Sequence, residues 1–190
     1  MSGWEALAAT LGIIYVILAT RESQWCWPFA FVSTVIYTLL FWKEQLPMQA
    51  LLNFYYMGMA IYGYLLWRRH GTIEDNLPIT RWPLSNQLIM LALGIVLTYA
   101  VGLYLTEYQL SKSPYLDAGV TVFSVINTWL MAKKVLQNWL YWIVINLAAI
   151  VLYVQNGFYA TIVMFGLYFI LAIAGFINWQ KLYRQQHNNN

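Results

Sequence analysis

Two groups of aromatic and amide side chains lie at helical spacing inside apolar stretches of the chain. Trp139, Trp142 and Asn146 follow one another at i, i+3 and i+7, so they share one helix face. Asn53 and Tyr56 share a face of another stretch in the same way. Two indoles beside an amide, with a further amide and phenol, can enclose a flat ring and hydrogen-bond its edge. The pattern predicts a site for a small flat molecule.

These residues also have structural interpretations. Trp139 lies near the start of its stretch, where a tryptophan often anchors a helix at the membrane surface. Trp142 and Asn146 lie deeper, which favours a functional role, because polar groups inside a membrane usually face a cavity or the bundle interior. Serine and threonine in such stretches most often bond their own backbone or pack at helix crossings. The other polar candidates are Ser33, Thr34, Asp117, Thr121, Ser124 and Asn127.

The sequence contains no pattern for catalysis, a metal or a cofactor. Both histidines, His70 and His187, lie outside the apolar stretches, Cys26 is the single cysteine, and neither G-x-S-x-G nor H-E-x-x-H occurs. Glu5 and Asp117 could pair, but both lie at the ends of stretches. We therefore expect no enzyme, no metal and no cofactor. A purely structural membrane subunit stays open as an alternative, although it would not explain polar groups placed at depth.

Composition places the chain in a membrane. Of the 190 residues, 61% are hydrophobic and 9% are charged, against about 25% charged in soluble domains. The net charge of +3 is scattered among loops, which argues against a nucleic-acid partner. No basic residue precedes the first apolar stretch, so we interpret it as a retained span and not a cleaved signal peptide.

Seven stretches are long and apolar enough to predict membrane-spanning helices. A long connection from Arg68 to Pro83 separates the third from the fourth, and a polar tail from Lys181 to Asn190 is expected to be frayed. The spans are expected at Trp4–Thr20, Trp25–Trp42, Leu46–Trp67, Leu84–Thr106, Tyr115–Ala132, Trp139–Val154 and Phe158–Trp179.

The distribution of lysine and arginine predicts the orientation. With seven spans, one side receives eight basic residues and the other receives only Lys43 and Lys112. Because basic loops stay in the cytoplasm, the N-terminus is expected outside and the C-terminus inside.

The first three spans resemble the last three at an offset of 112 residues. Without a gap, Trp27 meets Trp139 and Trp67 meets Trp179, and the pattern Tyr-x-x-x-Ala-x-x-Gly-x-x-x-Trp occurs in both. One span between two three-span repeats makes the repeats parallel, an architecture of transporters with a midplane site. The predicted organisation is a first repeat at 1–67, a cytoplasmic loop and linker helix at 68–112, a second repeat at 113–179 and a cytoplasmic tail at 180–190. An unrelated helical bundle is the alternative.

Three stretches resemble helices of the PnuC vitamin transporters. The run Asn138–Asn146 is similar to the family's sixth-helix signature, Asn53–Trp67 to its third helix, and Leu116-Asp117 with Lys133-Lys134 to its fifth. The resemblance implies a three-plus-one-plus-three, SWEET-like fold, a homotrimer in the bacterial inner membrane, and a W-x-x-x-N pocket motif at Trp142 and Asn146. It also implies facilitated uptake of nicotinamide riboside, with trapping by a cytosolic kinase.

The substrate and the mechanism are open at this point. Asn53 and Ser33 stand where the nicotinamide riboside transporters tend to have Gln and Asn, and the family includes a thiamine-transporting branch with short chains. Both vitamins are flat cations that could stack on tryptophan. No deep carboxylate is present for proton or sodium coupling, so we expect passive alternating access.

Overall fold

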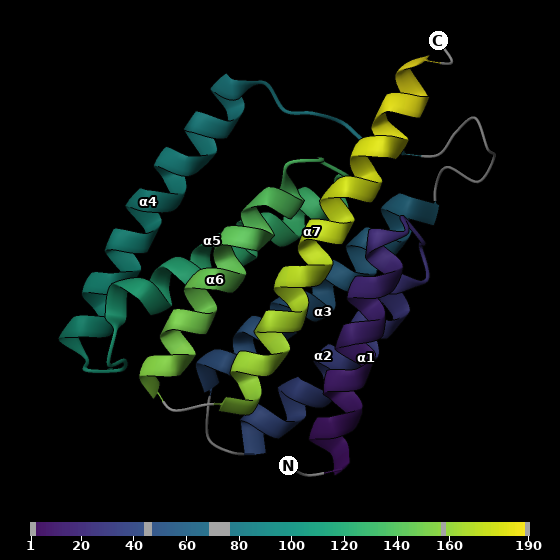
Figure 1. Cartoon of the computed structure of the whole chain (residues 1–190). Coiled ribbons are helices and arrows are strands. Elements are labelled where there is room, and N and C mark those ends of the chain that lie inside the picture. The colour runs from purple at the N-terminus through teal and green to yellow at the C-terminus, as the bar shows by residue number, and fades with distance from the viewer. Residues whose placement is uncertain (1–2, 44–46, 69–76, 157–158, 189–190) are drawn as a thin grey trace.

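The computed structural model describes residues 3–43, 47–68, 77–156 and 159–188, and these ranges form seven α-helices (Figure 1). α1 begins at one end of the bundle and α7 finishes at the other (Figure 1). The helices are α1 (Gly3–Thr20), α2 (Cys26–Lys43), α3 (Pro47–Arg68), α4 (Leu84–Glu107), α5 (Pro114–Ala132), α6 (Asn138–Asn156) and α7 (Tyr159–Asn188).

Each expected span falls on one helix, and the bounds agree to within two residues except at the end of α7. The frayed tail expected from Lys181 is wrong as far as Asn188, because α7 continues through it. That stretch has no glycine or proline, and Leu182 and Tyr183 pack against the hydrophobic core. The Tyr183 and His187 rings also contact each other, with centroids 4.2 Å apart.

The helix packing falls into two halves, α1–α3 (the first half) and α5–α7 (the second half). Within the halves, α1 packs on α2 and α2 on α3, while α5 packs on α6 and α6 on α7. The halves meet through α1 against α7 and through α3 against α5. If α1 is matched with α5 and α3 with α7, each of these two contacts corresponds to the other. α4 packs mainly on α5, a hydrogen bond from the Tyr141 hydroxyl to Gln87 joins it to α6, and it lies to one side of the other helices (Figure 1).

The turns that follow α1 and α5 have the same backbone geometry. The amide of Glu22 donates to the carbonyl of Ala19, and that of Lys134 donates to Met131, both over 3.0 Å. Glu22 and Lys134 also share a left-handed backbone, with φ of 58° and 52°. A left-handed residue directly after a helix ends it, because the backbone there turns away from the helix axis.

A glycine allows close approach of a buried indole in each half. A Cβ at Gly63 of α3 would lie 2.4 Å from Cε2 of Trp27, and a Cβ at Gly175 of α7 would lie 2.6 Å from Cδ2 of Trp139. No methyl group fits at such distances. The two glycines therefore let α2 pack on α3, and α6 on α7, through a tryptophan.

The described part of the connection before α4 binds the turn between α5 and α6. Ile79 is buried, and Thr80 exchanges two backbone hydrogen bonds with this turn, to the carbonyl of Lys134 and from the amide of Leu136. Residues 69–76 lie outside the described residues.

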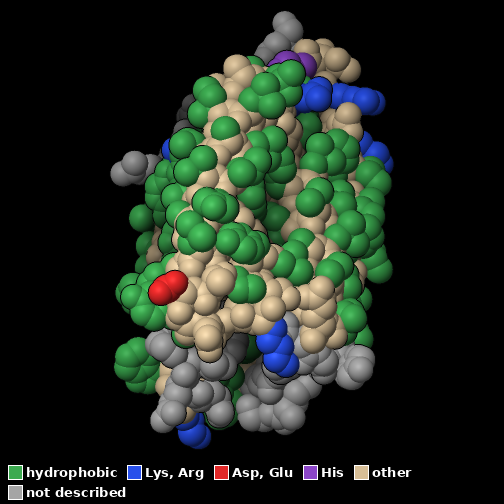
Figure 2. Space-filling model, turned by 90° about the vertical axis from the view of Figure 1, so that its left-hand side faces the viewer, with side chains coloured by type: hydrophobic (Ala, Val, Ile, Leu, Met, Phe, Trp, Pro, Cys, Tyr) green, Lys and Arg blue, Asp and Glu red, His purple; other side chains and the backbone are tan. Residues whose placement is uncertain are grey.

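Apolar side chains dominate the outside of the bundle. Two described segments, α4 and Ile162–Asn188 of α7, are long and apolar enough to cross a membrane, and shorter apolar stretches lie at Ala6–Thr20, Cys26–Leu40 and Asn138–Leu152. On the side that carries α4, hydrophobic side chains cover the middle, whereas lysine and arginine lie near the ends (Figure 2). Such a distribution suits a protein whose middle faces hydrocarbon.

Candidate functional site

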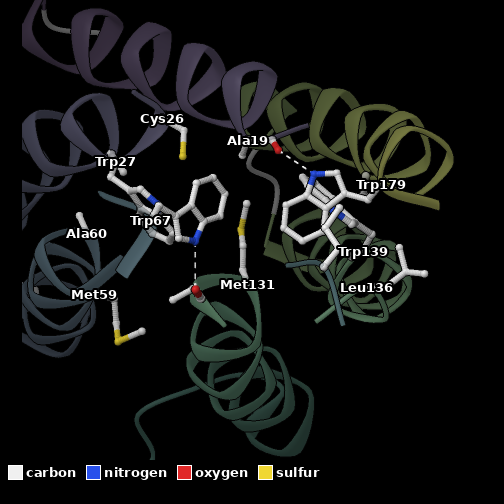
Figure 3. Close-up of a cluster of buried hydrophobic side chains, with 14 residues drawn as sticks. Ala19, Cys26, Trp27, Met59, Ala60, Trp67, Met131, Leu136, Trp139 and Trp179 are labelled. Atoms are coloured by element: carbon white, nitrogen blue, oxygen red, sulfur yellow. Dashed lines mark hydrogen bonds between the residues drawn. The ribbon is translucent and has the colours of Figure 1, made fainter. Parts of the chain in front are cut away.

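Four buried tryptophans form the centre of the contact between the halves (Figure 3). Trp27 meets Trp67 edge to face, with centroids 5.2 Å apart at 83°. Trp139 meets Trp179 in the same way, at 5.5 Å and 84°. Trp67 and Trp179 then contact each other across the halves at 6.1 Å. We call these four residues the tryptophan cluster.

Two indoles of the tryptophan cluster bond across the halves. Nε1 of Trp67 donates to the carbonyl of Ala132, and Nε1 of Trp179 donates to that of Ala19, both over 3.0 Å. Each half therefore supplies one donor and one helix-end carbonyl to the other. Nε1 of Trp27 and of Trp139 are buried without a partner among the described residues.

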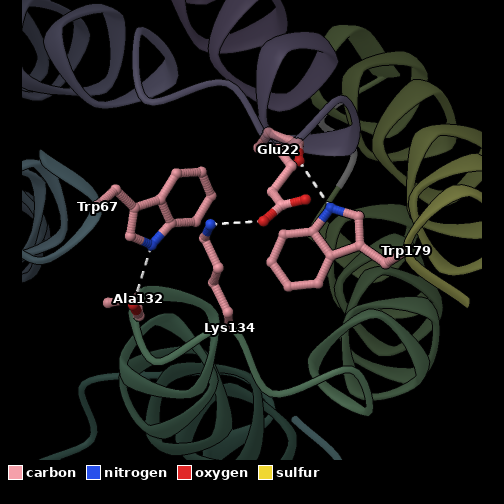
Figure 4. Close-up of polar contacts among 6 residues, drawn as sticks. Glu22, Trp67, Ala132, Lys134 and Trp179 are labelled. Carbon is pink, nitrogen blue, oxygen red and sulfur yellow. Dashed lines mark hydrogen bonds and ion pairs between the residues drawn. The ribbon is translucent and has the colours of Figure 1, made fainter. Parts of the chain in front are cut away.

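A buried ion pair lies beside the tryptophan cluster (Figure 4). Lys134 Nζ lies 2.5 Å from Glu22 Oε1, and the two side chains are 5% and 17% exposed. Nζ also lies 4.7 Å from the ring centroid of Trp67. The two charged residues are 112 positions apart in the chain, which is the offset of the expected repeats.

The three candidates on α6 lie at different depths. Trp139 belongs to the tryptophan cluster and is 1% exposed. Trp142, half-buried, packs against the core that contains this cluster. Asn146 lies near the middle of α6 and is 3% exposed. Among the described residues the Asn146 carboxamide forms no side-chain hydrogen bond, but its atoms are not among the fully buried polar atoms that lack a partner.

Two of the candidates lie on α3. Asn53 and Tyr56 are half-buried, and each of them has an interaction partner. Tyr56 contacts Tyr55, with ring centroids 5.8 Å apart. The Tyr55 hydroxyl donates to the carbonyl of Val125 over 2.8 Å, which joins α3 to α5.

The remaining candidates are spread over other contacts. Asn127 is buried, its Nδ2 donates to the carbonyl of Asn138, and its Oδ1 has no described partner. Ser33 donates to the carbonyl of Ala8 and thereby joins α2 to α1. Thr121 is half-buried on α5. Asn127 thus lies near the tryptophan cluster, whereas Ser33 bonds within the first half.

Two shallow hollows lie on the outside of the bundle. One, of about 340 Å³, is lined by α3 residues including Phe54 and Met59. The other, of about 390 Å³, lies between α4 and α5 and includes Trp82 and Asn86. Neither hollow is lined by Trp142 or Asn146.

Sequence reasoning missed Glu22 and Lys134 as a pair. Lys134 entered the sequence analysis only as a basic residue and as part of the family resemblance, and Glu22 was not singled out. The 112-residue offset was the available signal, because residues on an axis between two equivalent halves touch their own counterparts. Within the described residues no group of three His, Cys, Asp or Glu side chains could hold a metal ion.

Comparisons with known proteins identify the family. Residues 2–181 match the family model described as nicotinamide mononucleotide transporter. The nicotinamide riboside transporter PnuC of Escherichia coli is 25% identical over 211 residues, covering 98% of this chain and 88% of the relative. The riboflavin/roseoflavin transporter RibM of Streptomyces davaonensis is 27% identical over 173 residues, covering 89% and 80%.

A solved structure has the same fold. The crystal structure of the vitamin B3 transporter PnuC superposes with a TM-score of 0.78 at 24% identity, covering 96% of this chain and 82% of that one. The chain belongs to the nicotinamide mononucleotide transporter family, which matches nearly its full length. It is therefore a membrane protein of a transporter family, as the resemblance to PnuC proteins predicted.

Proposed function

We propose that this member of the family carries nicotinamide riboside across the bacterial inner membrane by facilitated diffusion, without converting it chemically. The full-length match to transporters of that vitamin supports the proposal. Seven spans then form two parallel three-helix repeats, 1–67 and 113–179, joined by α4. The exchange symmetry of the helix contacts and the matching turns at Glu22 and Lys134 support these repeats.

The carboxamide of Asn146 carries the assignment of the site. It lies near the middle of α6, almost fully buried, and none of the described side chains hydrogen-bonds it. A ligand that hydrogen-bonds this carboxamide would gain about 0.5–1.5 kcal/mol. Trp142, one turn away on the same face, would stack on the pyridinium ring.

We place the ion-pair end, where Glu22 and Lys134 meet, at the cytoplasm. The loops at this end hold most of the lysines and arginines, and loops rich in basic residues stay in the cytoplasm. In this conformation the tryptophan cluster fills the contact between the halves near that end. Transport then requires the halves to part there. A trimer and trapping by a cytosolic kinase complete the proposal and rest on the family resemblance alone.

Calorimetry of the purified chain against nicotinamide riboside tests the proposal. We expect binding to the wild type and a loss of about tenfold for Trp142→Ala, the size of a cation–π contact. Asn146→Leu removes the amide at similar volume and should weaken binding at least as much. Trp25→Ala and Asn86→Leu are matched controls, because both side chains are exposed away from α6. Unchanged binding in both α6 variants would remove the site assignment.

Riboflavin is the second candidate substrate, because a relative at 27% identity is named for riboflavin and roseoflavin transport. Its ring system is also flat, but it is neutral and larger, so stacking would act without a cation–π term. Titrating riboflavin and thiamine beside nicotinamide riboside separates the three. Tighter binding of riboflavin than of nicotinamide riboside would replace the proposed substrate while keeping the proposed site.

A further inference from the structure

The ammonium group of Lys134 lies in a site built by side chains of the first half. Its Nζ contacts the Glu22 carboxylate at 2.5 Å and faces the Trp67 ring at 4.7 Å. A carboxylate and an indole face together attract any flat or compact cation, because one supplies charge and the other its ring quadrupole. Lys134 thus occupies a cation site as a tethered ligand.

The ligand and the site belong to different halves. Glu22 lies in the turn after α1 and Trp67 near the end of α3, whereas Lys134 lies between α5 and α6 (Figure 4). Trp27, also of the first half, holds the Trp67 ring edge to face at 5.2 Å. If the halves part at this end, Glu22 and Trp67 stay together on the first half and lose their cation.

We propose that Glu22 and Trp67 form a second binding site for an organic cation, which Lys134 occupies in this structure and which the transported cation takes when Lys134 withdraws. This inference rests on the proposed function, since it requires a cationic substrate that passes between the halves. The substrate then moves from Trp142 and Asn146 to Glu22 on its way to the ion-pair end.

The exchange has a physical reason. Withdrawal of Lys134 leaves a largely buried carboxylate without its partner, which is strongly unfavourable. A cation arriving from the central site compensates that charge, so it favours opening of the ion-pair end. A neutral molecule of the same shape cannot do so. The ion pair therefore makes opening selective for cations.

A simpler role for the pair is a latch that only holds the halves together. A latch is broken equally by Glu22→Gln and Lys134→Met, and its loss affects cationic and neutral ligands alike. The cation site instead predicts that the two variants change cation binding in opposite directions. Lys134→Met leaves the site vacant and should strengthen cation binding, whereas Glu22→Gln removes the carboxylate and should weaken it.

The test titrates 1-methylnicotinamide, a pyridinium cation, and neutral nicotinamide into the full-length chain by calorimetry. Lys134→Met should bind the cation about tenfold more tightly than the wild type does, with nicotinamide unchanged. Glu22→Gln/Lys134→Met is the matched control, because it holds no unpaired charge, and it should lose the gain. The melting temperature of each variant shows that it is folded.

The charge exchange Glu22→Lys/Lys134→Glu keeps an ion pair. This variant replaces Lys134→Met in the test if Lys134→Met does not fold. It should melt near the wild-type temperature, yet carry 1-methylnicotinamide less well relative to nicotinamide in proteoliposomes. Equal changes for both ligands, or a cation gain that survives in the double neutral variant, would overturn the cation site. Absence of nicotinamide riboside binding to the wild type would instead refute the proposed function, since these tests use other ligands.

Discussion

Replacing Gly63 with alanine tests whether the helices of the first half close directly on a buried indole. The new Cβ would lie 2.4 Å from both Cε2 and Cζ2 of Trp27. That indole is 1% exposed and is held by Trp67 on one side and Tyr15 on another. Because the ring has no free space to turn into, the methyl group must push α3 away from α2.

The expected loss follows from two opposing effects. Overpacking of a filled core costs about 1–3 kcal/mol, and so tight a contact belongs at the upper end. The alanine also gains roughly 1 kcal/mol of helix propensity. We expect a net loss of about 2 kcal/mol, which for a chain of this length lowers the melting temperature by roughly 4–8 °C. Thermal unfolding of the detergent-purified protein measures it.

Gly58→Ala is the matched control on the same helix, because no described atom lies within 4 Å of its Cβ. This variant should melt at the wild-type temperature or slightly above it. Gly175→Ala, whose Cβ lies 2.6 Å from Trp139, should behave like Gly63→Ala. The reasoning fails if Gly63→Ala and Gly58→Ala have the same melting temperature. A smaller partner, Trp27→Phe, should recover part of the loss in the double variant.

Two further predictions concern helix contacts. Trp67→Phe should destabilise the protein by about 1 kcal/mol more than Trp27→Phe. Of these two indoles, that of Trp67 donates to a described carbonyl, that of Ala132, and that of Trp27 does not. The same melting assay measures both variants, and a larger loss for Trp27→Phe would contradict the prediction. Gly102→Ala brings a Cβ to 2.3 Å from Tyr115, but that side chain is 45% exposed and can turn. The melting temperature of Gly102→Ala should therefore fall less than that of Gly63→Ala.

The sequence was sufficient to predict where the helices begin and end in most of the chain. Charged or polar residues separate the apolar stretches, and the helices end at these same residues. The end of α7 was the exception. Apolarity stops at Trp179, but helix-forming residues continue, and Tyr183 finds a packing partner in the core. Hydropathy reports where lipid contact ends and not where a helix ends.

The candidate site was less accessible from the sequence. Depth along α6 follows from counting residues, so the difference between Trp139 and Asn146 was predictable. Whether a tryptophan faces a cavity or a neighbouring indole depends on the opposite helix. Trp139 lies on Trp179 and over Gly175, which no reading of α6 alone could show. The roles of the site residues therefore stay predictions until binding is measured.

The charges of Glu22 and Lys134 gain a reason from the proposed repeats. A residue near an axis between two identical halves meets its own copy, so an acidic or a basic residue there would face a like charge. Once both halves belong to one chain, the two positions can differ. Here one is Glu and the other is Lys, at the same backbone geometry and 112 residues apart. A variant with lysine at both positions, or with glutamate at both, places like charges together, and it should melt below the charge-exchanged variant, which keeps opposite charges at these positions.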